Sequence, residues 1–212
     1  MNPYYPTFLE LVNQENKDDA MLYVLDLLKE RKIELYELYD FFLRPVLNEF
    51  VCNMDDEICI WKEHVRTSIV RTILESTYPY LIEQKRLIQP NHQKVVVVCP
   101  SEEFHEVGAI IVTNYFTLAG FDAQYIGANT PKHDIISAVK SLKPDYLALS
   151  VTNYYNLVVT KQITEQIKGL YPSIKIVVGG SAFSKPGALD HLVYDYHLTS
   201  KEEIFKLGGN HS

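Results

Sequence analysis

The pair Glu103 and His105 has the residue types and the spacing of a metal-binding imidazole with its supporting carboxylate. A carboxylate two residues before a histidine can accept a hydrogen bond from one ring nitrogen, which fixes the tautomer and raises the basicity of the other nitrogen. A lone histidine in a loop is more often a surface or capping residue. The neighbouring acid is the feature that favours the ligand interpretation here.

Small and hydroxyl-bearing residues follow two apolar runs further along the chain. Ser150 and Thr152 close one run, and Gly179 and Gly180 close another. Glycine lets a ligand approach the backbone closely, but it also serves tight turns, and Ser or Thr at such places also caps helices. Phosphate binding of the usual kinds is disfavoured, because neither GxGxxG nor GxxxxGKS/T follows the first predicted strand.

These residues must be positioned by the second half of the chain, in which short β-branched runs alternate with helical patterns. A continuous apolar run such as residues 95–99 is typical of a strand buried on both faces. The alternation predicts βαβ crossovers and a doubly wound, flavodoxin-like parallel sheet of five strands over residues 89–212. The carboxyl ends of the strands meet at one edge, so we expect the residues above to gather there. The predicted strands are 94–99, 122–126, 145–151, 174–178 and 193–198, and the predicted helices are 105–119, 132–142, 157–170, 186–192 and one from Ser200.

The first half of the chain has helical periodicity instead. Apolar residues recur at intervals of three and four from Thr7 to about Arg86, and Pro45 should start or kink a helix. A further long helix is predicted from near Glu57 to Tyr78. Residues 1–88 therefore predict a four-helix-type bundle, and the fold class is α/β with this bundle before the sheet.

Composition and charge exclude several classes of protein. The 212 residues carry 20 Lys and Arg against 27 Asp and Glu, a net charge of −7 without a basic run, so we expect no direct nucleic-acid binding. No apolar stretch reaches the roughly 20 residues that span a bilayer, and no secretory signal is visible, which predicts a cytoplasmic protein without membrane contact. Three cysteines without CxxC spacing fit neither a disulfide framework nor a zinc site.

The segment from Glu103 to Gly108 resembles the Asp-x-His-x-x-Gly signature of cobalamin-binding domains. Ser150-Val151-Thr152 and Gly179-Gly180 are similar to the Ser-x-Leu/Thr and Gly-Gly elements of the same family. The resemblance covers residues 93–205, and the helical first half resembles the bundle that caps the corrinoid in these proteins. It implies a methionine-synthase-type helical cap followed by a Rossmann-like B12-binding domain.

The resemblance implies base-off, His-on binding of cobalamin in its adenosyl, methyl or hydroxo form. The dimethylbenzimidazole tail leaves the cobalt, and His105 becomes the lower axial ligand. Glu103 stands where the family usually has Asp, so its longer side chain changes the reach of the hydrogen bond to His105. The corrinoid is expected between this edge of the α/β domain and the helical cap. The expected contacts of the cofactor in the α/β domain are Glu103, Phe104, Val107, Gly108, Ser150, Thr152, Gly179, Gly180, Ser181 and Phe183.

The cap carries a second informative segment, Glu63-His64, which resembles the Glu-His pair of B12-dependent photoreceptors. Glu63 and Trp61 are expected to contact the cofactor, and His64 is a candidate upper axial ligand. In those photoreceptors a Trp that covers the upper axial group lies ten positions before the Glu, and here that position is Asn53. Two alternatives follow: another aromatic residue, Trp61 or Phe50, shields the upper face, or the upper ligand is methyl, hydroxyl or His64.

Three functions are consistent with these features. The first is a sensory or regulatory module, light-responsive in some members, in which the corrinoid changes association of the chain with itself or with a transcription regulator. The alternative is a methyl-carrying corrinoid protein that serves a methyltransferase system, and the third is a plain corrinoid store. We expect no enzymatic activity of the chain alone. The Glu-His pair favours regulation, whereas Asn53 favours methyl transfer.

Overall fold

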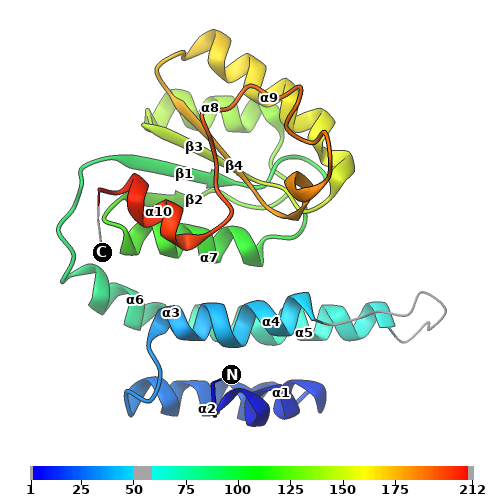
Figure 1. The fold of residues 1–212 in the computed structure, drawn as a ribbon, viewed down its shortest axis with the longest axis vertical. Coiled ribbons are helices and arrows are strands. Elements are labelled where there is room, and N and C mark those ends of the chain that lie inside the picture. Colours follow the sequence, from blue (N-terminus) through cyan, green and yellow to red (C-terminus); the bar gives the residue numbers. More distant parts are fainter. Residues whose placement is uncertain (1, 50–58, 210–212) are drawn as a thin grey trace. The chain divides into compact units, whose positions relative to one another are not determined.

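The computed structural model describes residues 2–49 and 59–209. The chain forms two compact units, Met1–Glu83 and Gln84–Ser212 (Figure 1). The first unit is helical and the second contains the sheet, and each has buried apolar residues of its own. In the part of the chain that the structure describes, no helix combines the length and the apolar character needed to cross a bilayer.

Helices make up the first unit, and aromatic packing forms its core. Phe8 and Phe42 are fully buried, and the Tyr5 ring stands edge-on to the Phe42 ring with 5.9 Å between centroids. This confirms the predicted helical bundle. The helices are α1 (Tyr5–Asn13), α2 (Lys17–Lys29), α3 (Leu35–Leu38), α4 (Arg44–Asn48), α5 (Cys59–Ser76) and α6 (Tyr78–Lys85), which runs into the second unit.

Local sequence explains where two of these helices begin. The Asn16 side chain accepts a hydrogen bond from the Asp19 N–H at 3.3 Å and caps α2. Pro45 lies in the first turn of α4, and the turn before it, Tyr39–Leu43, is a π-helix. Because Pro45 has no N–H to donate to the carbonyl four residues earlier, the helix widens at this point and then continues.

The five strands of the second unit pair in parallel, in the order β2-β1-β3-β4-β5. This confirms the predicted doubly wound sheet. The strands are β1 (Lys94–Val98), β2 (Asp122–Tyr125), β3 (Tyr146–Ser150), β4 (Lys175–Gly179) and β5 (Tyr196–His197), and the helices are α7 (Val107–Leu118), α8 (Lys132–Leu142), α9 (Leu157–Leu170) and α10 (Lys201–Leu207).

Helices cover both faces of the sheet, which explains its apolar central strands. α7 and α10 lie on one face, and α8 and α9 lie on the other (Figure 1). Val96 and Val98 of β1 belong to one core with Leu147 of β3, Ile176 of β4 and Ile163 of α9. A strand covered on both sides needs no polar face, so β1 is a continuous run of apolar residues after Lys94.

The sequence prediction is wrong near the end of the sheet. The short helix expected over residues 186–192 is a series of turns, and Gly187 there has a φ of 77°, a left-handed conformation that a helix does not contain. The last strand is shorter than expected, with only two residues. Its start is held by Asp195, whose carboxylate accepts the Ile176 N–H at 2.7 Å.

Candidate functional site

His105 lies in the loop that leaves β1 and enters α7. Its side chain is 57% exposed, whereas the Glu103 side chain is fully buried. Glu103 N–H donates to the Pro100 carbonyl at 3.0 Å, and Glu106 occupies the N-cap position of α7. The loop therefore carries an accessible imidazole and is anchored to regular structure at both ends.

One oxygen of Glu103 holds His105 twice. Oε1 lies 2.6 Å from Nδ1 of the imidazole and accepts the His105 backbone N–H at 3.2 Å. Burial alone would raise the pKa of this carboxyl, but hydrogen bonds from the His105 ring and from backbone N–H groups outweigh burial and lower the pKa to about 2. The ionised acceptor keeps the proton on Nδ1, which makes Nε2 the basic nitrogen of the ring.

The other oxygen of Glu103 ties this loop to the loop after β3. Oε2 accepts the backbone N–H groups of Thr152 and Asn153, each at 2.8 Å, and the side-chain amide of Asn156 at 3.2 Å. Thr152 is 49 residues further along the chain than Glu103. A single buried carboxylate thus joins two loops at the carboxyl edge of the sheet.

The ends of β3 and β4 meet at the same edge. Ser150 and Gly179 are register partners in the parallel pair. Gly180 has a φ of 114°, and a Cβ at this position would lie 2.2 Å from the Val151 carbonyl oxygen. Only glycine permits this backbone path, so the close approach of the two strand ends depends on Gly180.

The other predicted contacts in this unit differ in accessibility. Phe104 is 64% exposed, and Ser181 is exposed with its hydroxyl donating to a backbone carbonyl at 3.2 Å. Gly108 is exposed as well, and a Cβ there would meet no atom within 4 Å. Val107 and Phe183 are buried in the unit. Their contact with a cofactor stays a prediction.

The family model of the B12-binding domain matches residues 93–205. These residues make up more than half of the chain. They include every residue described above at the carboxyl edge of the sheet. The chain belongs to the B12-binding domain family. Its cofactor is therefore cobalamin.

Relatives of this B12-binding protein include a repressor and corrinoid proteins. The HTH-type transcriptional repressor CarA of Myxococcus xanthus is 25% identical over 173 residues, which are 82% of this chain and 52% of the repressor. The trimethylamine corrinoid protein of Methanosarcina barkeri is 31% identical over 108 residues, which are 50% of each chain. The chain spans about half the length of these curated relatives.

One solved structure shows the same fold. The monomethylamine corrinoid protein of Methanosarcina barkeri superposes with a TM-score of 0.77 and covers 95% of this chain and 94% of its own. The two sequences are 14% identical. At that identity the likeness concerns the arrangement of helices and strands.

The residues at the carboxyl edge of this B12-binding domain fit a cobalt corrinoid. An imidazole suits a transition metal, and the buried carboxylate of Glu103 supplies the hydrogen bond that orients such a ligand. Gly108 leaves open space at the start of α7, where a side chain would meet an approaching ligand. The donor and the open backbone therefore suit a large, flat cofactor held through one axial nitrogen.

The predicted cap residues lie on α5 in the helical unit. The side chains of Trp61, Glu63 and His64 are exposed. Asn53 and Phe50 lie outside the described residues. The roles of the cap residues toward cobalamin stay predictions.

Sequence reasoning missed several polar partners of the His105 loop. Asn153 and Asn156 donate to Glu103, and Tyr125 contacts both Cys99 and Glu106. Cys99 directly follows β1 and Tyr125 ends β2. That position, at the carboxyl end of a strand, is the signal by which these two residues could have been found.

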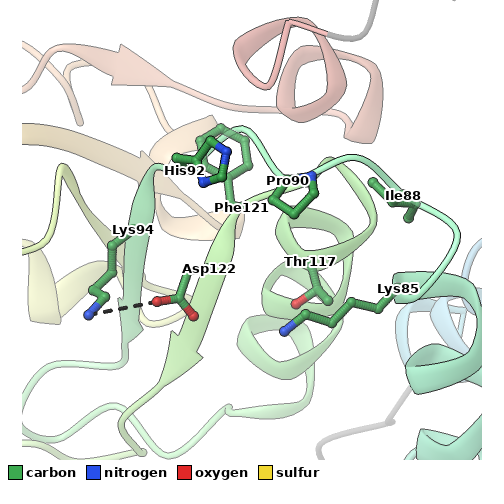
Figure 2. A pocket seen from close by; sticks show the side chains of 9 residues that line it. Lys85, Ile88, Pro90, His92, Lys94, Thr117, Phe121 and Asp122 are labelled. Atoms are coloured by element: carbon green, nitrogen blue, oxygen red, sulfur yellow. Dashed lines mark ion pairs between the residues drawn. The ribbon is translucent and has the colours of Figure 1, made fainter.

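A hollow lies at the opposite edge of the sheet, where β1 and β2 begin (Figure 2). Its volume is about 390 Å³, and the Lys94 ammonium and the Asp122 carboxylate approach to 3.7 Å in its wall. Lys85, His92 and Phe121 also line it. None of the residues predicted to contact cobalamin is among its lining residues, so it is separate from the predicted cobalamin site.

Proposed function

We propose that this chain holds cobalamin in the base-off, His-on form, with His105 as the lower axial ligand of cobalt. The observation that carries the proposal is the 2.6 Å contact between Nδ1 of His105 and the buried Glu103 carboxylate. With the proton held on Nδ1, the ring offers Nε2 to the metal. The cofactor supplies the cobalt chemistry, and the chain orients the ligand and sets its basicity.

The nucleotide tail is proposed to lie along the carboxyl ends of β3 and β4. The pairing of Ser150 with Gly179 and the positive φ of Gly180 support this path, because small residues keep bulky side chains away from it. The open space at Gly108 supports entry beside the start of α7. Ser150 and Thr152 bring hydroxyl groups to the same edge for polar contacts with the tail.

A sensory or regulatory role is the function we favour for the chain. The likeness to the repressor CarA covers more residues than the α/β unit contains, so it extends into the helical unit. The Glu63-His64 pair in that unit also favours this role. In such a module cobalamin changes the association of the chain with itself or with a transcription regulator.

A methyl-carrying corrinoid protein is the second candidate. It is supported by 31% identity to a trimethylamine corrinoid protein and by Asn53, where a photoreceptor cap would have tryptophan. In that role the partner is a methyltransferase, and His105 supports the cobalt while its upper ligand is exchanged.

An absorption spectrum tests the axial ligand. Purified apoprotein is mixed with hydroxocobalamin, and wild type is compared with His105→Ala. We expect the His-on spectrum in wild type and its loss in the variant. The matched control is His133→Ala, because the His133 side chain is 81% exposed at the start of α8, and this variant should keep the wild-type spectrum. A His-on spectrum in His105→Ala would disprove the assignment.

Illumination separates the two candidate roles. The protein is loaded with adenosylcobalamin or methylcobalamin, and its molar mass is followed by light scattering in the dark and after illumination. A light-dependent change of mass supports sensing. A protein that is indifferent to light and accepts methyl groups from a methyltransferase supports the carrier role.

A further inference from the structure

A second set of hydrogen bonds holds the His105 loop from the side of the sheet. The phenol of Tyr125 donates to Oε2 of Glu106 at 3.0 Å. The Cys99 thiol donates to the backbone carbonyl of His105 at 3.8 Å, and its sulfur lies 3.9 Å from the Tyr125 oxygen. These contacts converge on His105 and on the residue that follows it.

The Tyr125 hydroxyl and the Cys99 thiol each donate their hydrogen to a different acceptor. The Tyr125 hydroxyl hydrogen goes to the Glu106 carboxylate, and the thiol hydrogen goes to the His105 carbonyl. Burial raises the pKa of Tyr125 well above its ordinary value and raises the pKa of Cys99 to about 11. Both groups therefore keep their hydrogens in neutral solution, and the two donations do not compete.

Cys99 and Tyr125 are themselves held in place by backbone contacts. Cys99 is fully buried, its N–H donates to the Gly127 carbonyl at 3.0 Å, and its carbonyl accepts the Thr130 N–H at 3.0 Å. Tyr125 is the last residue of β2 and pairs in register with Val97 of the buried central strand. The loop is therefore attached to the carboxyl ends of β1 and β2.

We infer that Tyr125 is a positioning residue for the lower axial ligand, acting on His105 through Glu106. The inference rests on the proposed function of His105. Glu103 orients the imidazole ring, whereas Tyr125 fixes the main chain that follows the ring. Loss of the phenol hydroxyl leaves the contact between Glu103 and the His105 ring in place but lets the loop shift. A metal ligand has to be held to within about 0.5 Å of its productive position, so a shifted loop weakens the bond from His105 to cobalt.

The test compares wild type with Tyr125→Phe, which removes only the hydroxyl group, and with Tyr196→Phe on β5 as the matched control. Each full-length protein is loaded with hydroxocobalamin, and its His-on to His-off conversion is followed by absorption as the pH is lowered. At a given acidic pH we expect the His-on to His-off ratio to fall about tenfold in Tyr125→Phe, the effect of losing one hydrogen bond. The ratio should stay unchanged in Tyr196→Phe.

Variants of the acceptor separate positioning from folding. Glu106→Ala removes the acceptor and should reproduce the fall in the His-on to His-off ratio. Glu106→Gln still accepts the phenol hydrogen and should restore most of the wild-type ratio. In the protein without cofactor, a shifted loop should uncover the Cys99 thiol, so labelling of Cys99, resolved by peptide mapping, should be several-fold faster in Tyr125→Phe than in wild type.

Different outcomes would disprove the axial role of His105 and the positioning role of Tyr125. A wild-type protein that shows no His-on spectrum would disprove the proposed function of His105. A wild-type protein with that spectrum, whose titration is the same in Tyr125→Phe as in Tyr196→Phe, would disprove the positioning role alone.

Discussion

The length of the Glu103 side chain decides how many hydrogen-bond donors its carboxylate can reach. Oε1 contacts the His105 ring, and Oε2 accepts hydrogen bonds from three donors after β3. The aspartate of the family signature is shorter by one methylene group, roughly 1.5 Å of reach. At the observed distances that shorter side chain cannot serve both loops, so the extra methylene makes Glu103 a bridge between them.

We expect Glu103→Asp to keep the contact with His105 and to lose the donors of the β3 loop. Leaving these N–H groups without an acceptor should lower the free energy of unfolding of the unloaded protein by about 2–3 kcal/mol. Denaturant unfolding measures the difference, with Glu102→Asp, an exposed neighbour, as the control. Equal unfolding free energies for the two variants would contradict the bridging role.

Gly108 allows folding and binding to be tested apart. Because a Cβ there meets nothing within 4 Å and the residue is in the first turn of α7, Gly108→Ala should raise the unfolding free energy of the unloaded protein by about 0.5–1 kcal/mol. If the cofactor occupies the open space, the same methyl group should weaken cobalamin binding by about tenfold or more.

Calorimetry of hydroxocobalamin binding measures the effect of Gly108→Ala. The control is Gly169→Ala, since Gly169 also lies on a helix with open space around it but on α9. This control should gain stability and bind cobalamin like wild type. Unchanged affinity in Gly108→Ala would place the cofactor elsewhere.

Elements with strong local signals could be predicted from the sequence. The helices α8 and α9 begin and end at the predicted residues, because an amphipathic pattern depends only on neighbours along the chain. The segment 186–192 misled the prediction, since its Pro-Gly start suits a helix or a turn, and the left-handed φ of Gly187 is set by the folded surroundings. The two-residue β5 is equally a product of tertiary contacts.

The site follows the same division between local and long-range contacts. The contact between Glu103 and His105 could be predicted, because the two residues share one loop. The bonds from Glu103 to Thr152 and from Tyr125 to Glu106 could not, since each requires the order and register of the strands. Sequence therefore predicted the contact of His105 with its neighbouring acid but not the contacts that hold the loop.

The edge strand β5 depends on one carboxylate, that of Asp195. Burial raises the pKa of this group, but the Lys168 ammonium at 2.6 Å and the Ile176 N–H outweigh burial and lower the pKa below its ordinary 3.8. Folding therefore favours the ionised form. The stabilisation is present above about pH 3.8 and is lost as the pH falls through the lower pKa of the folded state.

We expect Asp195→Asn to lower the unfolding free energy by about 1–2 kcal/mol near neutral pH, because the charged acceptor is lost. The difference from wild type should shrink below about pH 3.8 and vanish as the pH falls through the lowered pKa of Asp195 in the folded protein. Denaturant unfolding at several pH values measures it, with Asp190→Asn, in an exposed turn, as the control. A difference that is constant with pH would contradict this account.

The helical unit and the B12-binding unit each carry one candidate cobalt ligand, His64 and His105. A regulatory role requires that the state of the cofactor reaches both units. Illumination of the protein loaded with an alkylcobalamin is the experiment that addresses this requirement.

We expect the spectrum of the adenosylcobalamin-loaded protein to change on illumination toward a form in which His64 is the upper ligand. His64→Ala should give a different final spectrum, because that ligand is missing. His191→Ala, an exposed histidine of the other unit, serves as the control and should behave like wild type. Identical spectra of wild type and His64→Ala, both in the dark and after illumination, would rule out the upper-ligand role.

Nine of the twelve residues of α7 are buried, and the helix contacts β1, β2 and α10. A helix enclosed in this way has little freedom to slide along its axis. If His105 binds cobalt as proposed, a displacement of its imidazole would be absorbed within the few residues between β1 and α7. In the proposed His-on form, making or breaking the bond to His105 would then be a small hinge motion of this loop.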